Sequence, residues 1–267
     1  MDPTLHEWLN LLVRWFHVVA GITWLGQTYL FNRLEGRLAE AARTAGQAEP
    51  VWLVHSGGFY IVHKDKSPPR LPDTLHWFKW ESALTWMSGL VLLLVVYYAG
   101  GLLTSDPDVG FGRAAAVGLG SLVVSWIAYD LLCRSPLGRS EAGTAVVGFV
   151  LLVALAFGLT RVLSGRAAYM HVGAVMGTIM AGNVWSLILP TQHRMIAAIG
   201  KGLRLEPALE DQAMLRTKHN TYLSVPLVFL MLSNHFPTAS YGHSWNWAML
   251  GVFLLMGFGA AHVMRRL

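Results

Sequence analysis

Three ionisable side chains lie in the stretch 75–99, which is otherwise apolar: His76, Lys79 and Glu81. At about 1.5 Å per residue, this stretch can cross a hydrocarbon core of about 30 Å, so we predict a transmembrane helix over 75–99. Ionisable groups inside such a helix are costly and mark candidate functional sites. On a helical wheel, His76 and Lys79 share one stripe and Glu81 lies on another, which predicts burial among other helices. Alternatively, Lys79 extends its ammonium group to the lipid headgroups.

Two further histidines lie within apolar segments. His17 lies roughly 13 Å below the outer boundary of the first segment by helix rise, and His171 lies near the outer end of the fifth. A neutral imidazole at such a depth needs either a hydrogen-bond partner or a metal, and for His17 the two interpretations have equal weight. Arg14, one turn outward, either pairs with a haem propionate or reaches the headgroups. Histidines without a carboxylate cluster favour haem or copper over magnesium or a di-iron site.

The composition is typical of a polytopic membrane protein. Of the 267 residues 54% are hydrophobic and 13% are charged, and there are 11 tryptophans. We expect a single integral membrane domain over 1–267. The only cysteine, Cys133, excludes an internal disulfide, a thiolate zinc cluster and a Cys-x-x-Cys-His attachment site, so any haem is held without covalent links.

The predicted fold is an all-α transmembrane bundle of about seven spans: 9–31, 75–99, 114–132, 144–162, 167–189, 222–236 and 245–264. Alternate connections carry fifteen Lys and Arg against three in the others. By the positive-inside rule, the N-terminus lies outside and the C-terminus in the cytoplasm. The net charge of +5 therefore reflects topology, and we expect no nucleic acid partner. In this topology His76, His219 and His262 lie near the cytoplasmic face and His171 and His235 near the outer face.

The loop insert 32–74 is too long for a plain linker. Residues 33–47 have helical composition, and 51–63 are predicted to form a β-hairpin that turns at Gly57-Gly58. In a later cytoplasmic loop, 193–199 and 208–218 are predicted to be interfacial amphipathic helices.

Several blocks resemble the membrane domain of the bacterial membrane-bound urate hydroxylases, the urate oxidases fused to a C-terminal cytochrome c. The blocks are VHSGGFY at 54–60, LHWFKWE at 75–81, YDLLCRSP at 129–136, HVGAVMGTIM at 171–180, HNTY at 219–222 and MLSNH at 231–235. The resemblance implies oxidation of urate to 5-hydroxyisourate, with electrons passed to cytochrome c in a bacterial inner membrane. The chain stops at Leu267, where the fused proteins continue into another span and a Cys-x-x-Cys-His domain. Three alternatives follow: a separate cytochrome c or respiratory-chain acceptor serves, this is a natural short form, or the activity has changed. The first span also resembles that of the haem-containing protoporphyrinogen oxidases, through His17, Trp24, Gly26 and Arg33, and this likeness favours haem b at His17.

On this basis we predict non-covalent haem b with His17 and His171 as candidate axial ligands, and with His235, His219 and Arg14 as further candidates for cofactor binding. His76 and His219 form a possible second, inner ligand pair. Lys79, Glu81, His76 and Asn220 are the candidate catalytic residues. A lysine and an amide suit the carbonyl groups of an anionic purine, and Glu81 or a free histidine suits proton transfer. Two alternatives remain: an electron-transfer subunit that holds haem b without a catalytic site, and a polytopic transporter.

Overall fold

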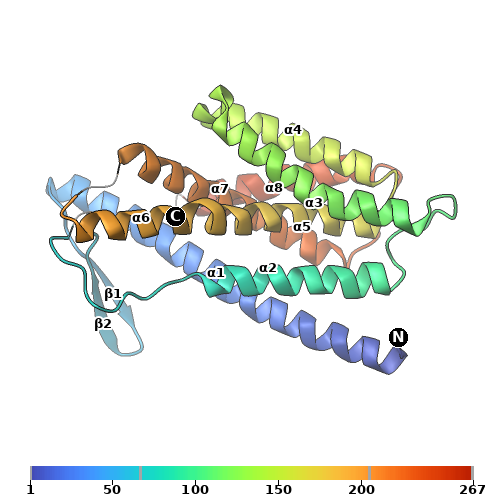
Figure 1. Cartoon of the computed structure of the whole chain (residues 1–267), viewed down its shortest axis with the longest axis horizontal. Coiled ribbons are helices and arrows are strands. Elements are labelled where there is room, and N and C mark those ends of the chain that lie inside the picture. Colours follow the sequence, from blue (N-terminus) through green and yellow to red (C-terminus); the bar gives the residue numbers. More distant parts are fainter. Residues whose placement is uncertain (1, 66–67, 204–205, 266–267) are drawn as a thin grey trace.

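The computed structural model describes residues 2–65, 68–203 and 206–265. Lys66, Arg204 and Arg266, three of the basic residues counted above, lie outside the described residues. The described chain is mostly helical with one two-stranded sheet, which confirms an all-α fold (Figure 1). The elements are α1 (Pro3–Ala45), β1 (Val51–His55), β2 (Gly58–Val62), α2 (Trp80–Leu93), η1 (Leu94–Ala99), α3 (Phe111–Arg134), η2 (Pro136–Arg139), α4 (Glu141–Leu159), α5 (Gly165–Asn183), η3 (Val184–Ile188), α6 (Leu189–Gly200), α7 (Pro207–Ser233) and α8 (Asn246–Met264).

Helix α1 runs without a break through the first predicted span and the helical part of the loop insert. Asp2 caps its start by accepting a hydrogen bond from the Leu5 amide at 3.0 Å, and Pro3 occupies the first turn. Its last residue is followed by Gly46 at φ 70°, a left-handed position that favours glycine. The predicted helix over 33–47 is therefore a continuation of α1.

The predicted hairpin is confirmed, but its turn differs by one residue. β1 and β2 pair antiparallel from Val51–Val62 to His55–Gly58. Ser56 and Gly57, with φ of 48° and 75°, form the turn, whereas Gly58 already belongs to β2. Two successive residues with positive φ form a two-residue turn whose twist matches that of the paired strands.

The prediction that a helix starts at Leu75 is wrong, because α2 begins only at Trp80. Trp77 stacks on His193 of α6, with ring centroids 4.6 Å apart, and Phe78 meets Phe31 of α1 edge-on at 5.3 Å. These contacts hold the preceding segment in a non-helical conformation. His76 is exposed in this segment and shares no helical stripe with Lys79.

The two segments predicted to be interfacial helices are helical, but each belongs to a longer helix, and their place at a membrane interface stays a prediction. α5, η3 and α6 form one continuous rod over Gly165–Gly200, and residues 208–218 belong to α7. η3 is a π-helical stretch directly before Pro190. A π-helical turn can accommodate the hydrogen bond that proline cannot make.

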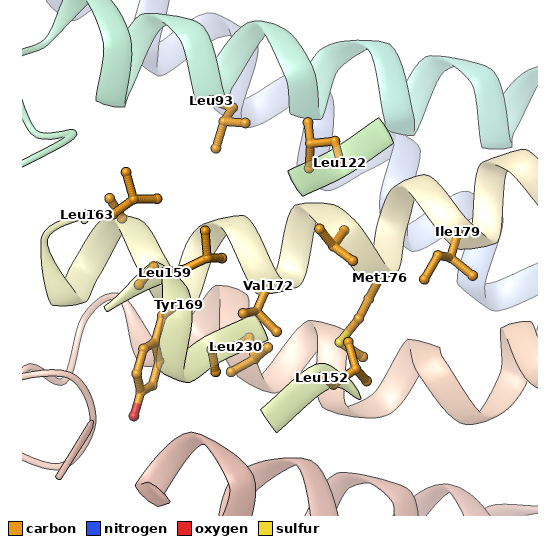
Figure 2. Close-up of a cluster of buried hydrophobic side chains, with 14 of the residues drawn as sticks. Leu93, Leu122, Leu152, Leu159, Leu163, Tyr169, Val172, Met176, Ile179 and Leu230 are labelled. Atoms are coloured by element: carbon orange, nitrogen blue, oxygen red, sulfur yellow. The ribbon is translucent and has the colours of Figure 1, made fainter. Parts of the chain in front are cut away.

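The hydrophobic core surrounds α5, which is buried on most of its sides. In Figure 1, α3 and α4 lie along the top, α2 and the N-terminal part of α1 lie along the bottom, and α5 and α6 run between them. Figure 2 shows leucines from α2, α3, α4 and α7 gathered around Val172 and Met176 of α5. Among the residues that the structure describes, six helical segments are long and apolar enough to cross a membrane: α1, α2 with η1, α3, α4, α5 to α6, and α8. A seventh span, through α7, stays a prediction.

Candidate functional site

His17 of α1 offers one free ring nitrogen in the part of the chain that the structure describes. Its Nδ1 lies 3.0 Å from the Thr85 carbonyl oxygen and 3.0 Å from Ser88 Oγ, both on α2. A carbonyl oxygen can only accept, so Nδ1 carries the proton and Nε2 carries the lone pair. Nε2 forms no hydrogen bond with any described residue. Metal-ligating histidines have this same arrangement, with one nitrogen donating to a carbonyl and the other left for the metal.

Glycine allows the two helices to approach each other at this histidine. A Cβ atom on Gly89 of α2 would lie 3.0 Å from His17 Cε1, which is tighter than an ordinary contact. One turn further along α1, Gly21 faces the Thr85 methyl group, 3.8 Å from an ideal Cβ position. The imidazole is therefore fixed between α1 and α2 by packing as well as by hydrogen bonds.

His171 differs, because both of its ring nitrogens have partners. It is completely buried, with Nδ1 2.7 Å from the Ala167 carbonyl oxygen and Nε2 2.9 Å from the Tyr98 hydroxyl. Nδ1 donates to the carbonyl, so Nε2 accepts from Tyr98. Gly118 of α3 closes the site, since a Cβ there would lie 2.8 Å from His171 Nε2.

The structure does not bring His17 and His171 together. His17 contacts Ser88, and His171 contacts Tyr98 ten residues further along the same rod, at a level about 15 Å away by helix rise. Two axial ligands of one iron lie only about 4 Å apart, since each metal–nitrogen bond is about 2 Å. Of the two candidates, His17 fits an axial ligand in its present geometry.

The remaining cofactor candidates lie in separate places. Arg14 donates from both Nε and Nη2 to Asn10 Oδ1, at 3.3 and 2.9 Å. His235 is exposed just after the end of α7. His219 lies 2.8 Å from the Tyr129 hydroxyl through its Nδ1. The proposed inner pair of His76 and His219 shares no contact among the described residues.

Lys79 and Glu81 lie together at the start of α2. Lys79 Nζ lies 5.5 Å from the ring centroid of Trp77 and 5.6 Å from that of Trp80. Trp80 in turn lies 5.9 Å from Trp185 of the π-helical η3. This arrangement places one ammonium group among several aromatic faces.

Glu81 carries an unused hydrogen-bond acceptor. Its Oε1 accepts from Gln27 of α1 at 3.2 Å, whereas its buried Oε2 has no partner among the described residues. Ser82, beside it, accepts from the Trp185 indole at 3.2 Å. A buried polar atom without a partner is costly, and such atoms are concentrated where a proton or ligand binds. We define Lys79, Glu81, Trp77, Trp80 and Trp185 as the α2 entry cluster.

Asn220 does not belong to the α2 entry cluster. It is buried in α7, accepts from Asn183 at 2.8 Å and donates to the Met180 carbonyl at 3.0 Å. Asn183 also accepts from Arg216 at 3.0 Å, and Arg216 pairs with Asp130 at 2.7 Å. Asp130 also pairs with Arg134 at 2.7 Å, so its carboxylate has two cationic partners.

Sequence reasoning missed Asn183 and Arg216 as members of this closed network, which also contains Tyr129 and His219. The available signal was an amide in an apolar span and a basic residue one turn before Asn220. The sequence alone does not show which residues these two contact, because the network joins α3, α5 and α7, which are far apart in the chain.

The long apolar helices, the buried polar network and the histidine between α1 and α2 define a protein compatible with multiple membrane crossings. The chain belongs to the urate oxidase N-terminal family, whose sequence profile matches residues 3–266. This match confirms the resemblance seen in the sequence. Neither the curated proteins nor the solved structures contain a match.

Proposed function

We propose that this protein is a membrane-bound oxidoreductase that converts urate to 5-hydroxyisourate and passes electrons to a cytochrome c. The family match over nearly the whole chain is the observation that carries the proposal. In the balanced reaction, urate and one water give 5-hydroxyisourate, two protons and two electrons. The protein must therefore bind an anionic purine, accept protons and provide a route for electrons.

The α2 entry cluster has the chemistry for the first two tasks. The Lys79 ammonium attracts the urate anion, and flat indole faces beside it suit stacking of a purine. The free Oε2 of Glu81 is suited to accept a proton released at the ring. His76 lies three residues before Lys79 and is exposed, so it is suited to carry protons onward to water.

His17 is the residue that we propose would hold the iron of a non-covalent haem b. Its protonated Nδ1 and free Nε2 suit this role, and the hydrogen bond to Thr85 fixes the ring orientation. A bound haem supplies one-electron redox chemistry. Gln27 of the same helix contacts Glu81, so α1 carries both His17 and a partner of the α2 entry cluster, about 15 Å apart by helix rise.

Anaerobic addition of urate to the purified protein tests the proposal. The expected result is reduction of the protein's own haem, seen as a shift of its absorption bands. Lys79→Met should keep haem but lose at least about tenfold in the rate of this reduction, since a charge-assisted contact is worth about 1.5–3 kcal/mol. Lys201→Met, which changes an exposed lysine just after α6, is the matched control and should behave as the wild type.

The outcomes separate the alternatives. Haem that is reduced by a chemical reductant but never by urate would leave an electron-transfer subunit without a catalytic site. Protein from haem-replete cells with no Soret band would contradict the haem assignment and favour the transporter.

A further inference from the structure

A basic hollow lies between α1 and the end of α8, away from the residues assigned above. Its volume is about 300 Å³, and it is lined by Tyr29, Asn32, Arg33, Arg37, Met264 and Arg265, with others. The apolar span of α1 ends just before Asn32, and α8 ends at Met264. The hollow therefore lies where two spans reach the same membrane boundary.

The hollow has an excess of positive charge. Arg37 pairs with Glu40 at 3.0 Å. Arg33 and Arg265 form no salt bridge with the described residues, and the Arg265 guanidinium lies over the Tyr222 ring at 5.3 Å. Three guanidinium groups and one carboxylate line the hollow, a net charge of about +2, and Glu141 outside the lining is paired with Lys218 while it also attracts Arg265.

The floor of the hollow is fixed by contacts between α1 and α7. Asn32 Nδ2 donates to Thr221 Oγ1 and to the Thr28 carbonyl, each at 2.8 Å. The Tyr29 hydroxyl lies 2.7 Å from Ser224 Oγ. Because these bonds hold the two helices in place, the floor does not depend on a ligand for its shape.

We propose that this hollow binds the phosphate group of an anionic phospholipid. Guanidinium groups match phosphate oxygens with paired hydrogen bonds. Basic pockets between transmembrane helices at a membrane surface suit anionic headgroups, and Met264 offers an apolar edge for the start of an acyl chain. Free inorganic phosphate shares the headgroup chemistry but would make no use of that apolar edge.

Native mass spectrometry of the full chain, released from nanodiscs of phosphatidylcholine with or without phosphatidylglycerol, tests this site. The wild type should retain phosphatidylglycerol selectively. Arg33→Gln with Arg265→Gln should reduce that retention at least tenfold, and Arg265→Gln alone should reduce it by a smaller factor. Arg43→Gln, in the last turn of α1 and outside the hollow, is the matched control and should retain as much as the wild type.

Two results would overturn the lipid assignment. Equal retention by the wild type and the double variant would place the lipid elsewhere. Displacement of phosphatidylglycerol by millimolar inorganic phosphate or urate would assign the hollow to a soluble anion, provided that retention of phosphatidylcholine is unchanged. Haem content and urate-dependent reduction are measured on the same samples, so failure of this site is distinguishable from failure of the proposed reaction.

Discussion

The α1–α2 pair and the α3–α5–α7 group both place polar side chains among apolar helices, but they use them differently. In the α1–α2 pair, His17 Nε2 and Glu81 Oε2 lack hydrogen-bond partners within the described chain. In the α3–α5–α7 group, Arg216, Asn183 and Asn220 bond to one another or to neighbouring residues. A closed network specifies packing, whereas open hydrogen-bonding positions are available to a ligand.

The two regions also differ in how many of their residues are buried. Of the most apolar 18 residues of α1, 6% are buried inside the molecule, against 56% of the most apolar 18 residues of the rod formed by α5, η3 and α6. The two regions should therefore respond differently to substitution. Changes between α1 and α2 should affect ligands, and changes in the α3–α5–α7 group should affect stability.

The largest expected effect is loss of haem from His17→Ala. Because His17 Nε2 is the free nitrogen, its removal should abolish the Soret band of the purified protein. His171→Phe should keep haem and lose about 1–3 kcal/mol of stability, since the Tyr98 hydroxyl loses its acceptor. Absorption spectra of the two variants at matched protein concentration measure how much haem each retains. Loss of haem from His171→Phe but not from His17→Ala would contradict the assignment of the haem ligand to His17.

The next effect is on folding stability. Arg216→Met should lower the free energy of unfolding by about 3 kcal/mol, because it leaves Asn183 Oδ1 without a donor and leaves Asp130 with only the exposed Arg134 as a partner. Lys218→Met, on the same helix, removes only an exposed pair with Glu141 and should cost less than about 1 kcal/mol. Thermal unfolding in detergent measures both, and equal costs would show that the network is not a stability element.

A smaller effect is expected at the close helix approach beside His171. A Cβ on Gly118 would lie 2.4 Å from the Tyr98 hydroxyl, so Gly118→Ala should cost about 1–3 kcal/mol. Gly120→Ala meets nothing within 4 Å and should be neutral or stabilise the helix by up to about 1 kcal/mol. Thermal unfolding midpoints of the two variants measure this difference. Equal midpoints would show that the close approach at Gly118 does not contribute to stability.

The smallest effect on stability should come from Glu81→Gln. This change keeps an acceptor for Gln27 and removes the charge beside the unpartnered oxygen, so unfolding should change by less than about 1 kcal/mol. Urate-dependent haem reduction should nevertheless slow, because the proton acceptor is lost. Undiminished reduction would remove Glu81 from the catalytic residues.

Local sequence signals predicted those features that depend on neighbouring residues. Gly57 and its alternating flanks predicted the hairpin, and the apolar runs predicted most of the spans. The start of α2 was missed because it depends on Trp77 stacking with His193, more than a hundred residues away in the chain. Asn220 was grouped with Lys79 by residue type alone, and only the fold separates them.

Helix α1 has 43 residues and is about 65 Å long, and it carries His17, Gln27 and Arg33 on one uninterrupted rod. A helix of this length can curve gently, but a sharp kink would break backbone hydrogen bonds, so it tilts or slides largely as a whole. A pull at one end therefore shifts every group along its length. His17, which we propose as a haem ligand, the Gln27 partner of Glu81 and the Arg33 side of the hollow therefore move together, so a tilt of α1 within a membrane would reach the proposed haem site.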